Sequence, residues 1–264
     1  MQEHRLIAVD MDGTFLNDKM DYDRERFARI YPQLLDQGTR FVVASGNQFY
    51  QLRSFFQDYP DVVYLSENGA LIRDDEQIYF ESAFKKEDAA KIARVLSSYP
   101  DVEWLASGVK SAYTLRTNDE AYLQDSRKYY YRLELIDDFD EIDDDIVKFS
   151  THCPANETAE YVATYAKVFA GIATPTSSGH GDIDIIQPGI HKARGLSELG
   201  KVLGVPASAM ITFGNGGNDI EMLQYAGTGV AVSNSPQDVL DAADVVTESN
   251  NAQGVLSYIE QNLL

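Results

Sequence analysis

Apolar and polar residues in the first eighty positions follow a pattern that predicts strands alternating with helices. Short apolar runs at 6–9, 41–44 and 62–65 predict buried strands. The segments between them, 23–36 and 48–56, repeat apolar residues at helical spacing. Strands that alternate with helices are typical of a parallel sheet with right-handed crossovers.

The pattern changes near residue 70, where alternating segments at 70–73 and 77–81 flank an acidic turn and predict a hairpin. Helices and strands are mixed from there to residue 187. The predicted elements are a helix over 85–98, a strand over 112–116, a helix opened by a capping-box spacing from Thr117 to Glu120, a strand over 147–151, a helix capped by Asn156 and a strand over 183–186. Such a mixture is typical of an α+β domain.

Parallel alternation resumes after residue 187. The predicted elements are helices over 193–203, 220–226 and 254–263, strands over 210–213, 229–232 and 245–246, and a helix that starts at Ser235 with Pro236 in its first position. The sequence therefore predicts an α/β fold with a Rossmann-like parallel-sheet core, formed by residues 1–82 and 188–264. An α+β domain, residues 83–187, is inserted in it as a cap. Ligands of such sheets bind beyond the carboxyl ends of the strands.

Charge limits the classes of partner. Among 264 residues, 22 Lys and Arg face 42 Asp and Glu, which gives a formal net charge of −20. Such a surface repels phosphate backbones and anionic lipid, so we expect neither nucleic acid nor a membrane as a partner.

Cys153 is the single cysteine, which excludes an intrachain disulfide. There is no apolar stretch of ~18 residues, and the apolar run at 6–9 is too short for a signal peptide. We expect a cytoplasmic protein.

Polar clusters follow several predicted strands, and the first is Asp10-Met11-Asp12-Gly13-Thr14. Two carboxylates two residues apart project to the same side of an extended chain. There they repel each other unless a cation or a shared proton intervenes. Gly13 permits the backbone to turn sharply after the strand, and such a turn would expose both carboxylates. An ordinary Asp-rich turn is the alternative, and Thr14 together with the preceding strand argues against it.

Two further clusters have the chemistry of a phosphate site. Ser45-Gly46-Asn47 combines a hydroxyl with backbone N–H groups at a strand end, although the same residues are common in ordinary turns. Lys192 stands at the start of a predicted helix, where a cation opposes the helix dipole. That position suggests a role beyond stability, with a solvated surface lysine as the alternative.

The last cluster, residues 214–219 with the sequence GNGGND, again joins a strand to a helix. Asn218 or Asp219 could simply cap that helix. The glycines do not satisfy the GxGxxG spacing, which excludes a dinucleotide-binding loop.

In this order, and each at a strand end, the clusters resemble the four motifs of the haloacid dehalogenase superfamily of phosphotransferases. The matching positions are residues 10–14 for the first motif, Ser45 for the second, Lys192 for the third and residues 214–219 for the fourth. The inserted block looks like the class II cap of the Cof-type subfamily. The stretches at 42–48 (VVASGNQ) and 67–70 (ENGA) look closest to bacterial sugar-phosphate phosphatases of that subfamily. The resemblance covers essentially the whole chain.

The resemblance implies a magnesium-dependent phosphatase that acts on small phosphorylated sugars. Asp10 would attack phosphorus to form an aspartyl-phosphate. Asp12 would protonate the leaving oxygen and then deprotonate the hydrolytic water. The implied Mg²⁺ ligands are the Asp10 carboxylate, the Asp12 backbone carbonyl and, from the fourth motif, Asn215 and Asp219. The implied substrate-binding residues are Thr14, Ser45, Gly46, Lys192 and Asn218, with Thr14 bracing the Asp12 loop.

One residue departs from the family pattern. The family usually has Asp at the position of Asn215. An amide oxygen can still ligate magnesium, but the site loses one negative charge. We therefore expect weaker magnesium affinity than in a typical relative, with Asp219 able to compensate as a direct or outer-shell ligand.

Substrate selectivity is expected in the cap, which would also exclude water from the reaction. Tyr113 and the polar segment 177–182 are candidates, with a half-buried strand tyrosine and a solvent loop as the alternatives. The run at 127–132 mixes basic and aromatic residues, as single-strand binders do. The net charge of −20 favours instead a helix end that packs its tyrosines.

Two other functions stay open. A phosphotransferase or phosphomutase would pass the phosphoryl group to a second sugar, but such relatives generally carry a small cap after the first motif, and residues 15–44 leave little room for one. A catalytically silent phosphate-binding regulatory protein, disabled at Asn215, is the other alternative. The expected partner is a small phosphorylated sugar, and the expected assembly is a monomer or a weak homo-oligomer.

Overall fold

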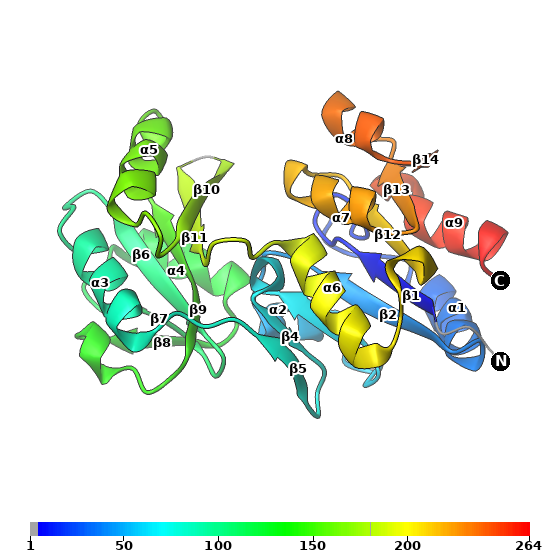
Figure 1. Cartoon of the computed structure of the whole chain (residues 1–264), viewed down its shortest axis with the longest axis horizontal. Coiled ribbons are helices and arrows are strands. Elements are labelled where there is room, and N and C mark those ends of the chain that lie inside the picture. The colour runs from blue at the N-terminus through cyan, green and yellow to red at the C-terminus, as the bar shows by residue number, and fades with distance from the viewer. Residues whose placement is uncertain (1–4, 180) are drawn as a thin grey trace. The chain divides into compact units, whose positions relative to one another are not determined.

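The chain forms two compact units in a computed structural model that describes residues 5–179 and 181–264 (Figure 1). Unit 1 comprises the described residues up to Gly46 together with Phe55–Phe80 and His191–Leu264. Unit 2 comprises Asn47–Ser54 and Glu81–Ile190. Unit 2 therefore includes a short segment that precedes the third strand of the chain, besides the long insertion. The division into a catalytic core and a specificity cap stays a prediction.

An eight-stranded sheet lies at the centre of unit 1, in the order β14-β13-β12-β1-β2-β3-β4-β5. The strands are β1 (Arg5–Val9), β2 (Thr39–Ala44), β3 (Val63–Ser66), β4 (Leu71–Arg73), β5 (Ile78–Glu81), β12 (Met210–Gly214), β13 (Thr228–Val232) and β14 (Val245–Thr247). Those from β14 to β3 are parallel to one another, and β4 is antiparallel to β3. The predicted parallel-sheet core is confirmed, with β1 between β12 and β2.

Helices cover both faces of this sheet, because successive strand residues point to opposite sides. The helices are α1 (Arg24–Asp36), α6 (Lys192–Leu203), α7 (Ile220–Tyr225), α8 (Gln237–Ala242) and α9 (Gly254–Asn262). On one face, Leu196 of α6 and Met222 of α7 join the apolar cluster of Leu6 and its neighbours. On the other face, the Phe27 ring of α1 lies 5.1 Å from that of Phe41. All the strands that end in predicted polar clusters are thus held between helix layers.

Unit 2 contains a six-stranded sheet in the order β10-β11-β9-β6-β7-β8. Its strands are β6 (Glu103–Gly108), β7 (Ala112–Leu115), β8 (Leu133–Ile136), β9 (Ile146–His152), β10 (Thr174–Gly179) and β11 (Asp182–Ile186). Its helices are α2 (Phe49–Ser54), α3 (Lys86–Leu96), α4 (Glu120–Tyr129) and α5 (Thr158–Val168). The pairs are antiparallel except for β7 with β8. This mixture is the expected α+β composition.

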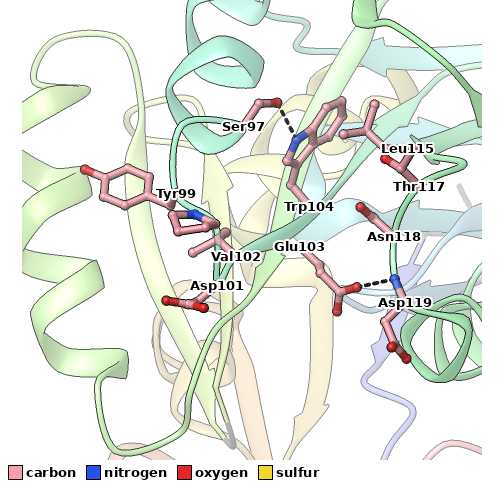
Figure 2. A pocket seen from close by; sticks show the side chains of 11 residues that line it. Ser97, Tyr99, Asp101, Val102, Glu103, Trp104, Leu115, Thr117, Asn118 and Asp119 are labelled. Carbon is pink, nitrogen blue, oxygen red and sulfur yellow. Dashed lines mark hydrogen bonds between the residues drawn. The ribbon is translucent and has the colours of Figure 1, made fainter.

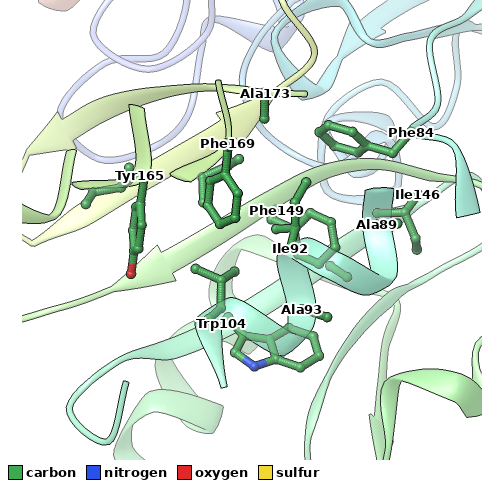
Figure 3. Close-up of a cluster of buried hydrophobic side chains, with 14 of the residues drawn as sticks. Phe84, Ala89, Ile92, Ala93, Trp104, Ile146, Phe149, Tyr165, Phe169 and Ala173 are labelled. Atoms are coloured by element: carbon green, nitrogen blue, oxygen red, sulfur yellow. The ribbon is translucent and has the colours of Figure 1, made fainter. Parts of the chain in front are cut away.

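An apolar cluster between α3, α5 and one face of this sheet forms the core of unit 2 (Figure 3). Ile92 of α3 and Tyr165 of α5 meet Trp104 of β6 and Phe149 of β9 there, and all four side chains are buried. Burial of large aromatic side chains stabilises a domain by roughly 1.5–3 kcal/mol each. Unit 2 therefore has a core of its own.

The structure corrects several details predicted for unit 2. Strands β6, β8 and β10 were not predicted. In the segment 177–182, weighed as a solvent loop, residues 177–179 belong to β10 and Asp182 begins β11, which pairs with it; His180 lies outside the described residues. Asp119, and not Thr117, caps α4 by accepting from the Ala121 N–H. Helix α5 begins at Thr158 after Glu157, without the predicted cap by Asn156.

The basic and aromatic run at 127–132 also differs from its prediction. Helix α4 ends at Tyr129, and the side chains of Tyr129 and Tyr131 are 46% and 57% exposed. The Tyr130 hydroxyl lies 3.1 Å from the Ser150 hydroxyl. Of the three tyrosines, only Tyr130 is partly packed.

In unit 1, Pro236 immediately precedes α8 rather than occupying its first position.

Within the described ranges, we find no helix that is both long and apolar enough to cross a membrane.

Candidate active site

Three charged side chains from distant parts of the sequence meet beyond the carboxyl end of β1. The Lys192 ammonium donates to Asp10 Oδ1 at 2.7 Å and to Asp219 Oδ1 at 2.6 Å. All three residues are buried, with exposed fractions of 1% for Lys192, 0% for Asp219 and 7% for Asp10. We call them the Lys192 cluster. A buried charge is costly unless it is paired, so this arrangement fixes the lysine against both carboxylates.

One ammonium cannot compensate two ionised carboxylates, so the Lys192 cluster has a net charge of −1 when Asp10 and Asp219 are both ionised. Burial and the neighbouring Asp219 carboxylate raise the pKa of Asp10 to about 7, although Lys192 opposes the rise. Burial alone would lower the pKa of Lys192, but Asp10 and Asp219 outweigh it and raise that pKa. The uncompensated charge gives the cluster an affinity for a further cation.

Asp219 also organises the fourth motif. Its Oδ2 accepts from the backbone N–H groups of Asn215 at 3.0 Å and Gly216 at 2.9 Å. Since its Oδ1 accepts from Lys192, both carboxylate oxygens are engaged by protein donors. This engagement favours the outer-shell alternative for Asp219, in which it holds the loop and the lysine in place.

The first and fourth motifs are joined through Thr14 and Asn215. The buried Thr14 hydroxyl donates to Asn215 Oδ1 at 3.0 Å. Gly13 has φ +76°, and a Cβ on it would collide with the Asn215 side chain. The turn that exposes Asp12 thus requires glycine, both for its left-handed backbone and for the close approach of Asn215. The Thr14 hydroxyl thus links this turn to Asn215 of the fourth motif.

The second motif lies at the end of the neighbouring strand β2. Ser45 is buried, its N–H donates to the Leu65 carbonyl at 2.9 Å, and its carbonyl accepts from the Asn68 N–H at 3.0 Å. Gly46 follows, and a Cβ placed on it would lie 3.1 Å from Asn68 Oδ1. Because β1 and β2 are parallel neighbours, their carboxyl ends bring Asp10 and Ser45 to the same edge of the sheet.

Two further asparagines lie at this edge, of which only Asn218 was predicted as a site residue. Asn218 is exposed, with its side-chain oxygen beside Gly216. Asn234, which follows β13, donates its amide N–H to the Gly13 carbonyl at 2.8 Å, and sequence reasoning missed it. An asparagine directly after a predicted strand is the signal that could have identified it.

The first and fourth motifs contain hard oxygen donors of the kind that suits Mg²⁺. They are the Asp10 carboxylate, the backbone carbonyl of the exposed Asp12 and the Asn215 amide oxygen. Across the described chain, no three His, Cys, Asp or Glu side chains are grouped so that they could hold a metal by themselves. A magnesium site at this edge therefore depends on the amide and the carbonyl as well as on carboxylates.

Predicted site residues are absent from a depression in unit 2 (Figure 2). It is lined by Ser97, Tyr99, Pro100, Asp101, Val102, Glu103, Trp104, Leu115, Thr117, Asn118 and Asp119. Two hydrogen bonds join residues of its lining: Trp104 Nε1 donates to Ser97 Oγ at 2.9 Å, and the Asp119 N–H donates to Glu103 Oε1 at 2.7 Å. Tyr113, predicted as a selectivity residue, is a buried residue of β7 whose hydroxyl donates to Asp144 Oδ2 at 3.1 Å.

Comparison with known proteins places this geometry in context. Residues 7–259 match the model of the haloacid dehalogenase-like hydrolase family. The chain is 42% identical, over 98% of its length and 96% of the relative, to an Escherichia coli protein named 5-amino-6-(5-phospho-D-ribitylamino)uracil phosphatase YbjI.

Two solved structures have a fold similar to that of this chain. The crystal structure of SMU.1108c from Streptococcus mutans is similar with a TM-score of 0.89, at 36% identity and 99% coverage of both chains. The sugar phosphatase BT4131, of HAD subclass IIB, is similar with a TM-score of 0.79 over 97% of this chain and 98% of that one. At 20% identity, this second likeness shows the fold alone.

Proposed function

Because the chain belongs to the haloacid dehalogenase-like hydrolase family and is a phosphoric monoester hydrolase, we propose that it is a Mg²⁺-dependent phosphatase of small phosphorylated sugars and sugar alcohols. The observation that carries the proposal is the Lys192 cluster. A buried ammonium at 2.7 Å from Asp10 can neutralise a phosphoryl group that approaches this carboxylate. In a chain with a net charge of −20, an anionic substrate requires cationic groups at the site, which the Lys192 ammonium and a bound Mg²⁺ would supply together.

Asp10 is the proposed nucleophile. An oxygen of its carboxylate forms a bond to phosphorus while the bond to the ester oxygen breaks, and the sugar leaves as an alcohol. The Asp10 N–H donates to the Phe213 carbonyl at 3.0 Å, which anchors this residue at the end of β1 beside β12. Such anchoring supports in-line attack, because phosphoryl transfer depends mainly on positioning and charge neutralisation.

Asp12 is the proposed general acid and base. Its side chain is exposed, whereas that of Asp10 is buried, so the two carboxylates have different environments two residues apart. An exposed carboxyl can give a proton to the leaving oxygen and then take one from the water that hydrolyses the aspartyl-phosphate. Phosphate is the second product.

The proposed magnesium ligands are the Asp10 carboxylate, the Asp12 backbone carbonyl and the Asn215 amide oxygen, with Asp219 in the outer shell. When bound, Mg²⁺ supplies positive charge that offsets the repulsion between the site and the phosphate dianion. Ser45, Gly46, Lys192 and Asn218 are proposed to bind the phosphoryl oxygens. Residues 1–82 and 188–264 are proposed as the catalytic core, and residues 83–187 as the domain that selects the substrate.

The proposed substrate follows from the named relative. Since a protein that is 42% identical is named as a phosphatase of a ribitylaminouracil phosphate, a phosphorylated sugar alcohol joined to a pyrimidine is the first compound to test. Hexose, pentose and nucleotide phosphates complete the panel. We expect the protein to release phosphate when no acceptor sugar is present. A phosphomutase or transferase would need such an acceptor.

The decisive experiment measures phosphate release with Mg²⁺, after chelation by EDTA, and in Asp10→Asn. We expect turnover with Mg²⁺ and none in the other two samples. Absence of turnover at every metal concentration would instead favour a silent phosphate-binding protein. A beryllofluoride adduct on Asp10 in a crystal structure would identify the nucleophile, and an intact protein without that adduct would contradict the covalent route.

A further inference from the structure

A strained turn lies between the two proposed phosphate-binding groups of unit 1. It is the segment η1 (Glu67–Gly69), which follows β3. Glu67 and Asn68 have φ of +51° and +57°, and Gly69 has φ of +96°. Residues other than glycine rarely adopt this left-handed backbone conformation, and two of them in succession persist only where the surrounding structure holds them. Strain of this kind is commonly found at functional sites.

One side of η1 holds the second motif. The Asn68 N–H donates to the Ser45 carbonyl at 3.0 Å, while the Ser45 N–H donates to the Leu65 carbonyl at 2.9 Å. A Cβ placed on Gly46 would lie 3.1 Å from Asn68 Oδ1 and 3.2 Å from its Nδ2. The backbone and the side chain of Asn68 thus both restrict the Ser45–Gly46 loop.

The other side of η1 packs against the first turn of α6, which begins at Lys192. A Cβ on Gly69 would lie 2.9 Å from the His191 carbonyl oxygen, and one on Gly195 would lie 3.1 Å from the Gly69 Cα. Glu67, at 1% exposure, is buried at the base of the turn. Backbone therefore packs directly on backbone, so the position of η1 and the position of Lys192 are coupled.

We propose that Asn68 is a positioning residue for phosphoryl transfer. It holds the Ser45–Gly46 loop at a fixed distance from Lys192, so that the Ser45 hydroxyl, the Gly46 N–H and the lysine ammonium bind one phosphoryl group together. Asparagine suits the position because it tolerates left-handed backbone better than other L residues and brings a short amide to Gly46. This inference rests on the phosphate-binding roles proposed above for Ser45 and Lys192.

The test compares Asn68→Ala with Met20→Ala. Met20 has φ +57° and a side chain 46% exposed, so its variant changes a residue in the same backbone region without touching the second motif. The readouts are the competitive inhibition constant of inorganic phosphate and the kcat/KM for p-nitrophenyl phosphate with Mg²⁺. We expect Asn68→Ala to weaken phosphate inhibition and to lower kcat/KM by about tenfold or more, a loss of about 1.4 kcal/mol. Met20→Ala should change neither by more than about twofold.

A second pair of variants separates positioning from a folding defect. Asn68→Gly fits φ +57° without strain, so it should fold at least as well as Asn68→Ala and still weaken phosphate inhibition, since the amide is missing. Gly46→Ala should weaken inhibition by about tenfold because its methyl group meets that amide. Adding Asn68→Gly to Gly46→Ala should cause little further loss. Strictly additive losses, or Asn68 variants with wild-type inhibition, would overturn the proposal.

Failure of this inference is distinguishable from failure of the proposed function. If the wild-type protein hydrolyses p-nitrophenyl phosphate and Asn68→Ala does so equally well, only the positioning role is refuted. If the wild-type protein is inactive, calorimetric titration with inorganic phosphate still decides whether Asn68→Ala weakens binding. A wild-type protein that neither hydrolyses nor binds phosphate would refute both.

Discussion

Each unit contains a lysine that is almost entirely buried, and the two lysines have different partners. Lys192 in unit 1 is 1% exposed and contacts two carboxylates at 2.6 and 2.7 Å. Lys148 in unit 2 is 2% exposed, lies 3.5 Å from Asp184 Oδ1 and lies 5.9 Å from the centroid of the Tyr130 ring. Similar burial is therefore combined with ion-pair distances of 2.6 and 2.7 Å in one case and 3.5 Å in the other.

The positions of the two lysines in their sheets explain the difference. Lys148 is within β9, where its neighbours are set by antiparallel pairing with β6 and β11. Lys192 opens α6 at the edge where the parallel strands of unit 1 end. In the Lys192 cluster, one ammonium faces two carboxylates. In unit 2, Lys148 lies near Asp184, whose side chain is 18% exposed and also accepts a hydrogen bond from Ser150 Oγ at 2.8 Å. Titratable groups with perturbed pKa values, such as Asp10, are concentrated at functional sites, so the Lys192 cluster is the one that we propose to be reactive. We expect Lys148 and Asp184 to form a structural pair.

The largest effect is expected at Asp10. Asp10→Asn removes the attacking oxygen charge while keeping the shape of the side chain, so we expect turnover of p-nitrophenyl phosphate to fall by about 10³-fold or more. The fold should survive, because Lys192 keeps its contact with Asp219. Initial rates with Mg²⁺ would test the loss of turnover, and a urea unfolding curve would test whether the fold survives. A variant with near-normal rates would contradict a nucleophilic Asp10.

Removal of the ammonium from the Lys192 cluster comes next. Lys192→Met leaves two buried carboxylates without their cation, so we expect a loss of about 3–5 kcal/mol in the free energy of unfolding. We also expect kcat/KM to fall by about 10²-fold or more, because the phosphoryl group loses a charged donor. Urea midpoints and initial rates measure the two effects separately. Wild-type stability in this variant would show that the lysine is not paired as described.

The contrast between the lysines could be predicted only in part from the sequence. Asp10, Ser45 and Lys192 were predicted as site residues because each adjoins a predicted strand or helix end. The burial of Lys192 could not be predicted, since its partners are 182 and 27 residues away in the chain. A solvated lysine and a fully paired one have the same local sequence, and only the sheet order distinguishes them.

The parallel core was also easier to predict than unit 2. Strands β1, β2 and β3 are buried on both faces and therefore consist of continuous apolar runs. Strand β10, with the sequence TPTSSG, contains proline and glycine and has no apolar alternation. Its strand conformation depends on pairing with β11, which is a long-range contact that no local pattern encodes. The left-handed turn at Glu67 and Asn68 is imposed by tertiary packing in the same way.

A smaller effect is expected when charge is added to the site of the Lys192 cluster. Asn215→Asp supplies the carboxylate that the family usually has, and the Thr14 hydroxyl can donate to it as it does to the amide. One extra negative charge should raise the apparent Mg²⁺ affinity by about tenfold, or about 1.4 kcal/mol. Activity measured over a magnesium titration would show the shift. Equal apparent affinities for the two proteins would refute the idea that Asn215 weakens metal binding.

The smallest effect is expected at the other lysine. Lys148→Met keeps the length and most of the volume of the side chain, and Asp184 retains the hydrogen bond from Ser150 and some contact with solvent. We therefore expect a loss of about 1 kcal/mol in the free energy of unfolding, well below that of Lys192→Met. Hydrolysis of p-nitrophenyl phosphate should change by less than about threefold, since this compound tests the chemistry of unit 1 alone. Measured under the same conditions, the two Met variants form a matched pair. If Lys148→Met reduced stability and turnover as much as Lys192→Met does, the distinction between an excess-charge site and a balanced structural pair would be wrong, because burial alone would then decide the role of a lysine in this fold.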